Sequence, residues 1–144
     1  MQTITSDIKY DLYGINNVQP IWADHYFKTI SNAKMGLNLS RGQAIKYYSS
    51  DRISQMVGNG LLTFVDKKTE LNDFFTKHEI IFYNSTSDLA DKINKYNKDD
   101  KLRIRIAKAG RDKYFKYFNS TLVAEYIINK TFNIDNKNFF WEKK

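Results

Sequence analysis

The sequence predicts a three-layer α/β domain in which about four parallel strands lie between helices on both faces, followed by a helical carboxyl-terminal part. Four apolar runs of strand length alternate along the chain with segments in which apolar residues recur at helical spacing. From Asp99 onward only helical spacing is found. A chain of 144 residues with 42% apolar residues has room for one core, so residues 1–144 are expected to form a single domain.

The amino-terminal part is expected to contribute two strands and one helix. Apolar runs at Tyr10–Tyr13 and Met35–Leu39 have the length of strands. Between them, Asp24–Ala33 is predicted to be a short helix because Tyr26, Phe27 and Ile30 are spaced to bury one stripe. Two strands separated by one helix are typical of a parallel pair.

The middle of the chain continues this alternation. Ser49-Ser50-Asp51 offers a choice of N-caps for a helix that Gly58-Asn59-Gly60 should end. Leu61–Val65 and Glu79–Tyr83 are the third and fourth predicted strands. A capping-box pattern, Ser85-Thr86-Ser87-Asp88, then begins the next helix.

The carboxyl-terminal part reads as helical. Gly110 is expected to weaken or bend the helix that starts near Asp99, and Asn119-Ser120 is expected to cap a last helix. Several aromatic residues near the end exceed what one small core should cover, so they are expected to leave apolar surface for a partner. They are Phe132, Phe139, Phe140 and Trp141.

The positive charge is concentrated in one segment. The chain carries a formal net charge of +7, and residues 95–116 hold nine basic and three acidic groups, which accounts for +6 of it. Either this is a solvated helix surface, or it attracts polyanions such as anionic membrane headgroups or nucleic acid. Nucleic acid is the weaker choice because no recognition motif accompanies the cations. The basic residues are Lys95, Lys98, Lys101, Arg103, Arg105, Lys108, Arg111, Lys113 and Lys116.

Residues suited to catalysis are sparse. The two histidines, His25 and His78, are far apart and lack a paired acid or hydroxyl, and cysteine is absent. The sequence therefore indicates no metal site and no cofactor, and it assigns no catalytic residue. The absence of cysteine, of a secretion signal and of a long apolar span predicts a cytoplasmic protein, with contact at the inner face of the membrane as a further option.

The segment from Ser40 to Gly60 has the features of a phosphate site. It combines a predicted strand end, a polar loop, a hydroxyl-rich helix start and a glycine turn. Ligands of parallel sheets bind where loops leave the carboxyl ends of strands, and a helix start offers unpaired N–H groups to an anion. The alternative is that Ser49 or Ser50 merely caps the helix and that Arg52 pairs with Asp51 or another neighbour. Spacing alone does not separate these two interpretations.

Several strings of residues, taken in order, resemble the carboxyl-terminal half of two-domain glycosyltransferases, and most closely the CgeB-like group. The resemblance covers roughly residues 8–130, and its strength lies in the ordered set. The strings are Lys34–Gly42, Ser49–Arg52, Gln55–Thr63, Glu79–Tyr83, Asp88–Ala90 and Ile106–Arg111, with Tyr10–Gly14 and Pro20–Trp22 upstream.

The resemblance implies the GT-B architecture, in which two Rossmann-like domains face each other and the carboxyl-terminal one holds the nucleotide-sugar donor. It implies that Ser40–Gly42 and Ser50–Arg52 face the donor diphosphate and that Gln55 stands where many relatives carry a glutamate that binds the ribose. The candidate donor-binding residues are thus Ser40, Arg41, Gly42, Ser49, Ser50, Asp51, Arg52, Gln55 and Asn59.

The chain also departs from this family pattern. Gln55 lacks the charge of a glutamate, and Tyr47 replaces an acidic residue found in many retaining relatives, so the stereochemical course stays open. The acceptor-binding amino-terminal domain is expected to be missing, and the chain alone is predicted to transfer no sugar. The competing hypothesis is a non-enzymatic module of the same fold that docks on a partner or an anionic membrane through residues 95–116.

Overall fold

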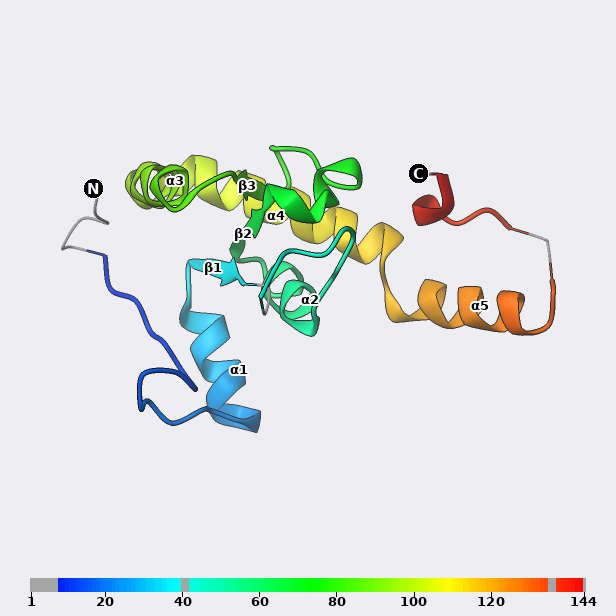
Figure 1. Ribbon diagram of the computed structural model, residues 1–144, viewed down its shortest axis with the longest axis horizontal. Coiled ribbons are helices and arrows are strands. Elements are labelled where there is room, and N and C mark those ends of the chain that lie inside the picture. The colour runs from blue at the N-terminus through cyan, green and yellow to red at the C-terminus, as the bar shows by residue number, and fades with distance from the viewer. Residues whose placement is uncertain (1–7, 40–41, 135–136, 144) are drawn as a thin grey trace.

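The computed structural model describes residues 8–39, 42–134 and 137–143 and shows an α/β domain built on a three-stranded parallel sheet (Figure 1). The strands lie in the order β1-β2-β3, with Met35 paired with Leu62 and Phe64 paired with Ile81. The elements are α1 (Ala23–Asn32), β1 (Met35–Asn38), α2 (Asp51–Gly58), β2 (Leu62–Asp66), η1 (Lys67–Thr69), η2 (Leu71–Asp73), β3 (Ile81–Tyr83), α3 (Thr86–Lys98), α4 (Asp100–Tyr117), α5 (Ser120–Thr131) and η3 (Phe140–Lys143).

Helices cover both faces of the sheet, as predicted. Side chains alternate along a strand, so Phe64 and Val65 of β2 point to opposite faces. Phe64, which is 1% exposed, lies in a cluster with residues of α3 and α4, whereas Val65 lies in a cluster with Ile53 and Val57 of α2. The predicted three-layer α/β class with a parallel sheet and a helical carboxyl-terminal part is therefore confirmed.

The prediction of a strand at Tyr10–Tyr13, the first of the four expected, is wrong. This segment pairs with no strand among the described residues, and Tyr10 is 74% exposed. A run of apolar residues becomes a strand only when a sheet edge accepts its backbone hydrogen bonds, and β1 accepts them from β2 alone. The segment instead leads into a loop beside α1 (Figure 1).

The predicted helix boundaries agree closely with the structure because they rest on local capping chemistry. The Ser85 hydroxyl accepts a hydrogen bond from the Asp88 amide and begins α3, and the Asn119 side chain accepts one from the Leu122 amide and begins α5. Asp99 likewise caps α4 by accepting from the Leu102 amide. These bonds join residues three apart, so the sequence alone reveals them.

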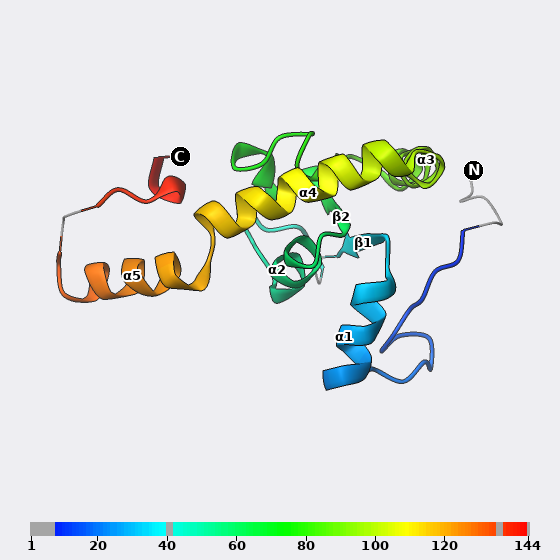
Figure 2. The ribbon, with the colours of Figure 1, turned by 180° about the vertical axis from the view of Figure 1, so that it is seen from behind.

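Gly110 lies inside α4 and does not interrupt it, and the expectation that it weakens or bends the helix stays a prediction. The helix continues to Tyr117, and a Cβ added at Gly110 would lie 2.2 Å from the carbonyl oxygen of Glu79. The glycine thus lets the backbone of α4 approach the chain just before β3. Figure 2 shows α4 running along the sheet and past it toward the turn that begins α5.

The aromatic tail is largely covered, which corrects the expectation of an open aromatic surface. Phe139 is 3% exposed, and Phe140 stacks on Tyr117 with ring centroids 4.5 Å apart. Trp141 stacks on Phe118, which packs against the cluster around α2. Only Phe132 of the four named aromatics stays mostly exposed, at 70%. The chain after α5 folds back and supplies the cover itself.

Candidate functional site

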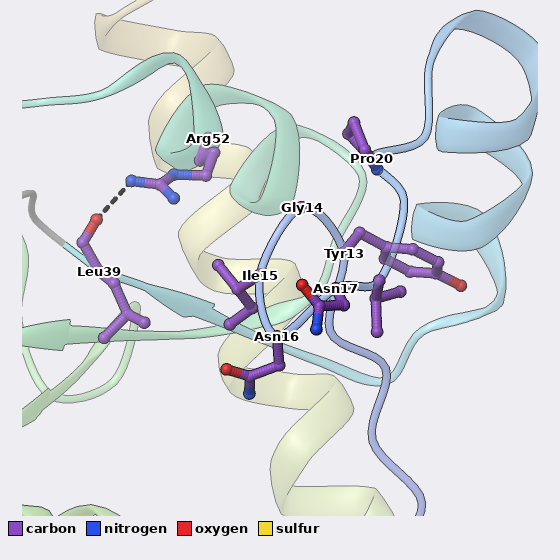
Figure 3. A pocket seen from close by; sticks show the side chains of 9 residues that line it. Tyr13, Gly14, Ile15, Asn16, Asn17, Pro20, Leu39 and Arg52 are labelled. Carbon is purple, nitrogen blue, oxygen red and sulfur yellow. Dashed lines mark hydrogen bonds between the residues drawn. The ribbon is translucent and has the colours of Figure 1, made fainter.

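An open pocket of about 720 Å³ lies where the carboxyl end of β1 meets the start of α2 (Figure 3). Leu39, directly after β1, and Arg52, in the first turn of α2, form one side. The other side is a loop that precedes α1 and contributes Tyr13–Val18 and Pro20. This is the edge of a parallel sheet where ligands bind in other α/β proteins.

The loop that forms the far wall owes its shape to glycine and asparagine. Gly14, Asn16 and Asn17 all have left-handed backbone conformations, with φ of 75°, 52° and 62°. These residue types adopt that conformation most readily. The Gly14 amide donates to the Val18 carbonyl over 3.0 Å, which closes the loop. Sequence reasoning did not assign this loop to the site, although its Gly-Ile-Asn-Asn run is a turn signal.

Asn38, at the carboxyl end of β1, is the buried polar residue of the site. It is 1% exposed, and its Oδ1 accepts a hydrogen bond of 2.7 Å from the Ser50 hydroxyl. Its Nδ2 finds no hydrogen-bond partner among the described residues. A buried amide without a partner costs free energy, so such groups are rare unless a ligand or water completes them. Sequence reasoning missed Asn38, which it included only as part of a strand.

The start of α2 is left uncapped by side chains of the described residues. Ser50 occupies the N-cap position, but its hydroxyl points to Asn38 and makes no capping bond to the helix. Arg52 donates from its guanidinium to the carbonyl of Leu39, as the dashed line in Figure 3 shows. The alternative interpretation is thus wrong in that the Ser50 side chain does not cap the helix, and right in that Arg52 binds a neighbour within the chain. Its cationic group still forms part of the pocket wall.

Gln55 lies one turn further along α2 and faces α1. Its Oε1 accepts a hydrogen bond from the Tyr26 hydroxyl. Burial raises the pKa of Tyr26, and the positive charge of Arg52 partly opposes that rise. The phenol therefore stays protonated at neutral pH and can keep donating to Gln55. The contact joins α1 to α2 next to the pocket.

Asn59 lies at the opposite end of α2 from Ser50. Its Nδ2 donates to the Gln55 carbonyl over 2.7 Å, which places it at the helix C-terminus. An eight-residue helix is roughly 12 Å long, so Asn59 is not brought together with Ser50 and Arg52. The position of Asn59 therefore does not support the prediction that it binds the donor.

Of the remaining predicted residues, Gly42 and Ser49 lie in the loop that leads to α2, and Asp51 is the first residue of that helix. Ser40 and Arg41 fall outside the described residues, while Gly42, Ser49 and Asp51 are exposed. The loop is anchored by Tyr47, whose hydroxyl donates to Asp73 over 2.7 Å and whose ring contacts Phe74. The side chain of Tyr47 thus faces the core beside α2.

The basic segment does not place all nine of its cations on the surface. Arg103 is 5% exposed and binds Asp100, and Lys113 binds Glu79 over 2.9 Å with little exposure of either side chain. The expectation that all nine cations lie on the surface is therefore wrong for these two. The pair of Lys113 and Glu79 joins α4 to the chain before β3, whereas the pair of Arg103 and Asp100 lies within α4 itself. Within the described ranges no cluster of three or more histidine and acidic side chains gathers to hold a metal ion.

A family model described as glycosyl transferase-like matches residues 3–129 of this chain. The match covers most of the chain, and we conclude that the protein belongs to the glycosyl transferase-like family. The CgeB-like assignment within that family stays a prediction. No curated protein and no solved structure matches the chain. None of the helices in the described part of the chain is long and apolar enough to cross a membrane.

Proposed function

We propose that this domain binds the nucleotide-sugar donor of a glycosyl transfer reaction in the pocket of Figure 3. The observation that carries the proposal is the unpartnered Nδ2 of Asn38, buried at the carboxyl end of β1 and next to the uncapped start of α2. A donor of this class carries a diphosphate, whose oxygens accept hydrogen bonds. On this proposal a phosphate oxygen at the start of α2 accepts from the first amides of the helix, and Nδ2 of Asn38, which directly precedes the pocket residue Leu39, turns to a second oxygen when the donor binds.

The charges of the site favour such an anion. The amino end of a helix carries roughly half a positive charge, and it lies beside the guanidinium of Arg52. Arg52 now binds the Leu39 carbonyl, and a phosphate is a stronger acceptor than a carbonyl group. Asp51, in the first turn, is exposed and opposes the anion, so the net attraction depends mainly on Arg52.

The sugar and base of the donor would occupy the open part of the pocket. Asn16 and Asn17 offer amide groups that both donate and accept, which suits hydroxyl groups. We further propose that the transferred group is a hexose and that a facing domain holds the acceptor. On this proposal the chain alone binds the donor but does not turn it over, and no residue of this chain is assigned as the catalytic base.

Nucleoside diphosphates are expected to raise the melting temperature of the purified chain. A ligand at about 100 times its dissociation constant stabilises a protein by about 2.7 kcal/mol, which corresponds to several degrees for a chain of this length. Arg52→Ala and Ser50→Ala should remove most of that shift. Arg105→Ala, an exposed arginine on α4, is the matched control and should keep it.

A variant of Asn38 tests the proposed site in the same melting experiment. Asn38→Leu removes the unpartnered amide and also the acceptor of the Ser50 hydroxyl, so the melting temperature without nucleotide should fall modestly and serves as the baseline for this variant. The rise in melting temperature that nucleotide produces should be smaller in Asn38→Leu than in the unchanged chain. A full shift in both Arg52→Ala and Asn38→Leu would exclude this pocket as the diphosphate site.

A further inference from the structure

The outer face of α4 combines cations with exposed apolar residues. Lys101, Arg105, Lys108, Arg111 and Lys116 are exposed, at spacings of three to five residues that keep them on one side of the helix. The buried residues of α4, among them Ile106, Ala107 and Gly110, lie on the opposite side. The exposed acids of this helix are Asp100 and Asp112, which bind Arg103 and Lys108. The face therefore carries an excess of positive charge.

Two large apolar side chains stand among these cations. Ile104 is 60% exposed and Phe115 is 50% exposed, and the Arg111 guanidinium lies 4.8 Å from the centre of the Phe115 ring. Both side chains would lose contact with water if the face met an apolar layer. A purely solvated helix surface does not account for them as well as an interface does.

The next helix, α5, presents an apolar side to solvent. Val123, Ile127, Ile128 and Phe132 are 41%, 57%, 51% and 70% exposed, and the acidic residue within this stretch, Glu125, binds Lys137. Its other side packs on the tail, where Tyr126 contacts the ring of Phe139. An amphipathic helix normally turns its apolar side inward, so the arrangement here is reversed. Figure 2 shows that α5 follows α4 directly, beyond the sheet.

We propose that α4 and α5 dock the domain on the surface of an anionic lipid bilayer. Cations attract acidic headgroups, and exposed aliphatic and aromatic side chains enter the boundary between headgroups and acyl chains. Charge complementarity selects this occupant: the net charge is +7, and the excess is concentrated in the segment that forms α4. A nucleic acid would satisfy the cations but would leave the apolar side of α5 in water.

The docking surface shares no residue with the pocket of Figure 3. Variants of α4 and α5 therefore leave the proposed donor site intact, and the nucleotide-induced rise in melting temperature should be the same in each of them. Loss of vesicle binding with an unchanged nucleotide response would separate this inference from the proposed function.

The test is flotation of the purified chain with vesicles of phosphatidylcholine, with and without phosphatidylglycerol. Binding is expected only with phosphatidylglycerol and should weaken as salt is raised. The double variant Lys101→Glu/Arg105→Glu should weaken it at least tenfold, because each basic residue near such a surface contributes about 1 kcal/mol. Lys67→Glu/Lys68→Glu makes the same change in charge on η1, where both side chains are exposed, and should have a much smaller effect.

A second pair of variants tests the apolar contribution. Ile127→Ser/Ile128→Ser should also weaken vesicle binding about tenfold or more, whereas Ile45→Ser, at another exposed isoleucine, should not. Equal losses in the α4 and η1 charge variants would overturn the inference, as would full binding by the α5 variant. Binding to duplex DNA or RNA in place of vesicles would identify a nucleic-acid surface and would also overturn it.

Discussion

The first part of the described chain, residues 8–50, and the second, residues 51–118, differ in how they hold their structure. Ile30 and Asn38 are the residues of the first part that reach the buried class, and its exposed large apolar residues include Tyr10, Trp22 and Phe27. The second part contains both large clusters of the core and exposes Ile104 and Phe115. The pocket lies on the boundary between the two parts.

The second part therefore acts as the scaffold of the domain, and the first part supplies the adaptable wall of the candidate site. The second part supplies β2, α3, α4 and all of α2. The buried residues of α2, Ile53, Met56 and Val57, hold this helix in place and so fix the positions of Ser50 and Arg52 at its start. The first part is attached through the pairing of β1 with β2 and through Ile30, which packs on Met56 and Leu61. The loop that it supplies for the far wall of the pocket, residues 13–20, is exposed throughout. Segments with few buried contacts open at low free energy cost, so the wall can adapt to a ligand while the helix start stays in place.

The largest expected effect compares one phenylalanine from each part. Phe64→Ala removes a ring that is 1% exposed and should lower the free energy of unfolding by about 3–5 kcal/mol. Phe27→Ala removes a ring that is 60% exposed and should cost less than about 1 kcal/mol. Urea unfolding followed by circular dichroism measures both. Similar losses for the two variants would contradict the division into scaffold and site.

The next effect compares a glycine in each part. Gly110→Ala places a methyl group 2.2 Å from the Glu79 carbonyl oxygen, so the backbones of α4 and of the chain before β3 must separate, at a cost of about 2–3 kcal/mol. Gly42 has no atom within 4 Å of its missing methyl group, but its φ is 70°. Gly42→Ala should therefore cost about 1–2 kcal/mol, from backbone conformation alone. Thermal unfolding of both variants checks the order, and a reversed order would show that α4 can move away from β3.

The smallest expected effect compares two ion pairs and depends on pH. Burial raises the pKa of Glu79, but hydrogen bonds from Thr76 and Lys113 outweigh burial and hold it below its ordinary value of 4.5. The folded state therefore gains stability from the ionised Glu79 above about pH 4.5 and loses it as the pH falls through the lower, folded-state pKa. Glu79→Gln should cost about 1–2 kcal/mol at pH 7 and much less in strong acid.

The control for this experiment is the exposed pair of Lys46 and Glu70, which links the loop before α2 to the segment after β2. Glu70→Gln should change the stability by less than about 1 kcal/mol at either pH, because exposed pairs contribute little. Urea unfolding at neutral and acidic pH measures both variants. A pH-independent effect of Glu79→Gln would show that the carboxylate charge does not matter there.

The features that could be predicted from the sequence are those formed by residues close to one another along the chain. The caps at Ser85, Asp99 and Asn119 bond to amides three residues away, and the helices they begin were predicted within one or two residues. The parallel sheet followed from the alternation of apolar spacing. The stretch that supplies the start of α2, Ser50 to Arg52, was also identified from its polar residues after a strand.

The errors fall where contacts join distant parts of the chain. The segment Tyr10–Tyr13 has the composition of a strand, but no sheet edge receives it among the described residues. The loop at Gly14 reaches the pocket only because α1 returns the chain to β1, and the burial of Arg103 depends on how α4 packs. The cover over Phe139 requires the tail to turn back after α5.

The sequence by itself thus determined the class of fold, the helix starts and the concentration of charge, since each arises from residues a few positions apart. Only the tertiary structure decided that Asn38 would be buried with an unpartnered amide beside α2, and that the apolar side of α5 would face solvent. Both depend on which surfaces of the folded chain come into contact. Those contacts join residues far apart in the sequence, so no local spacing of residues predicts them.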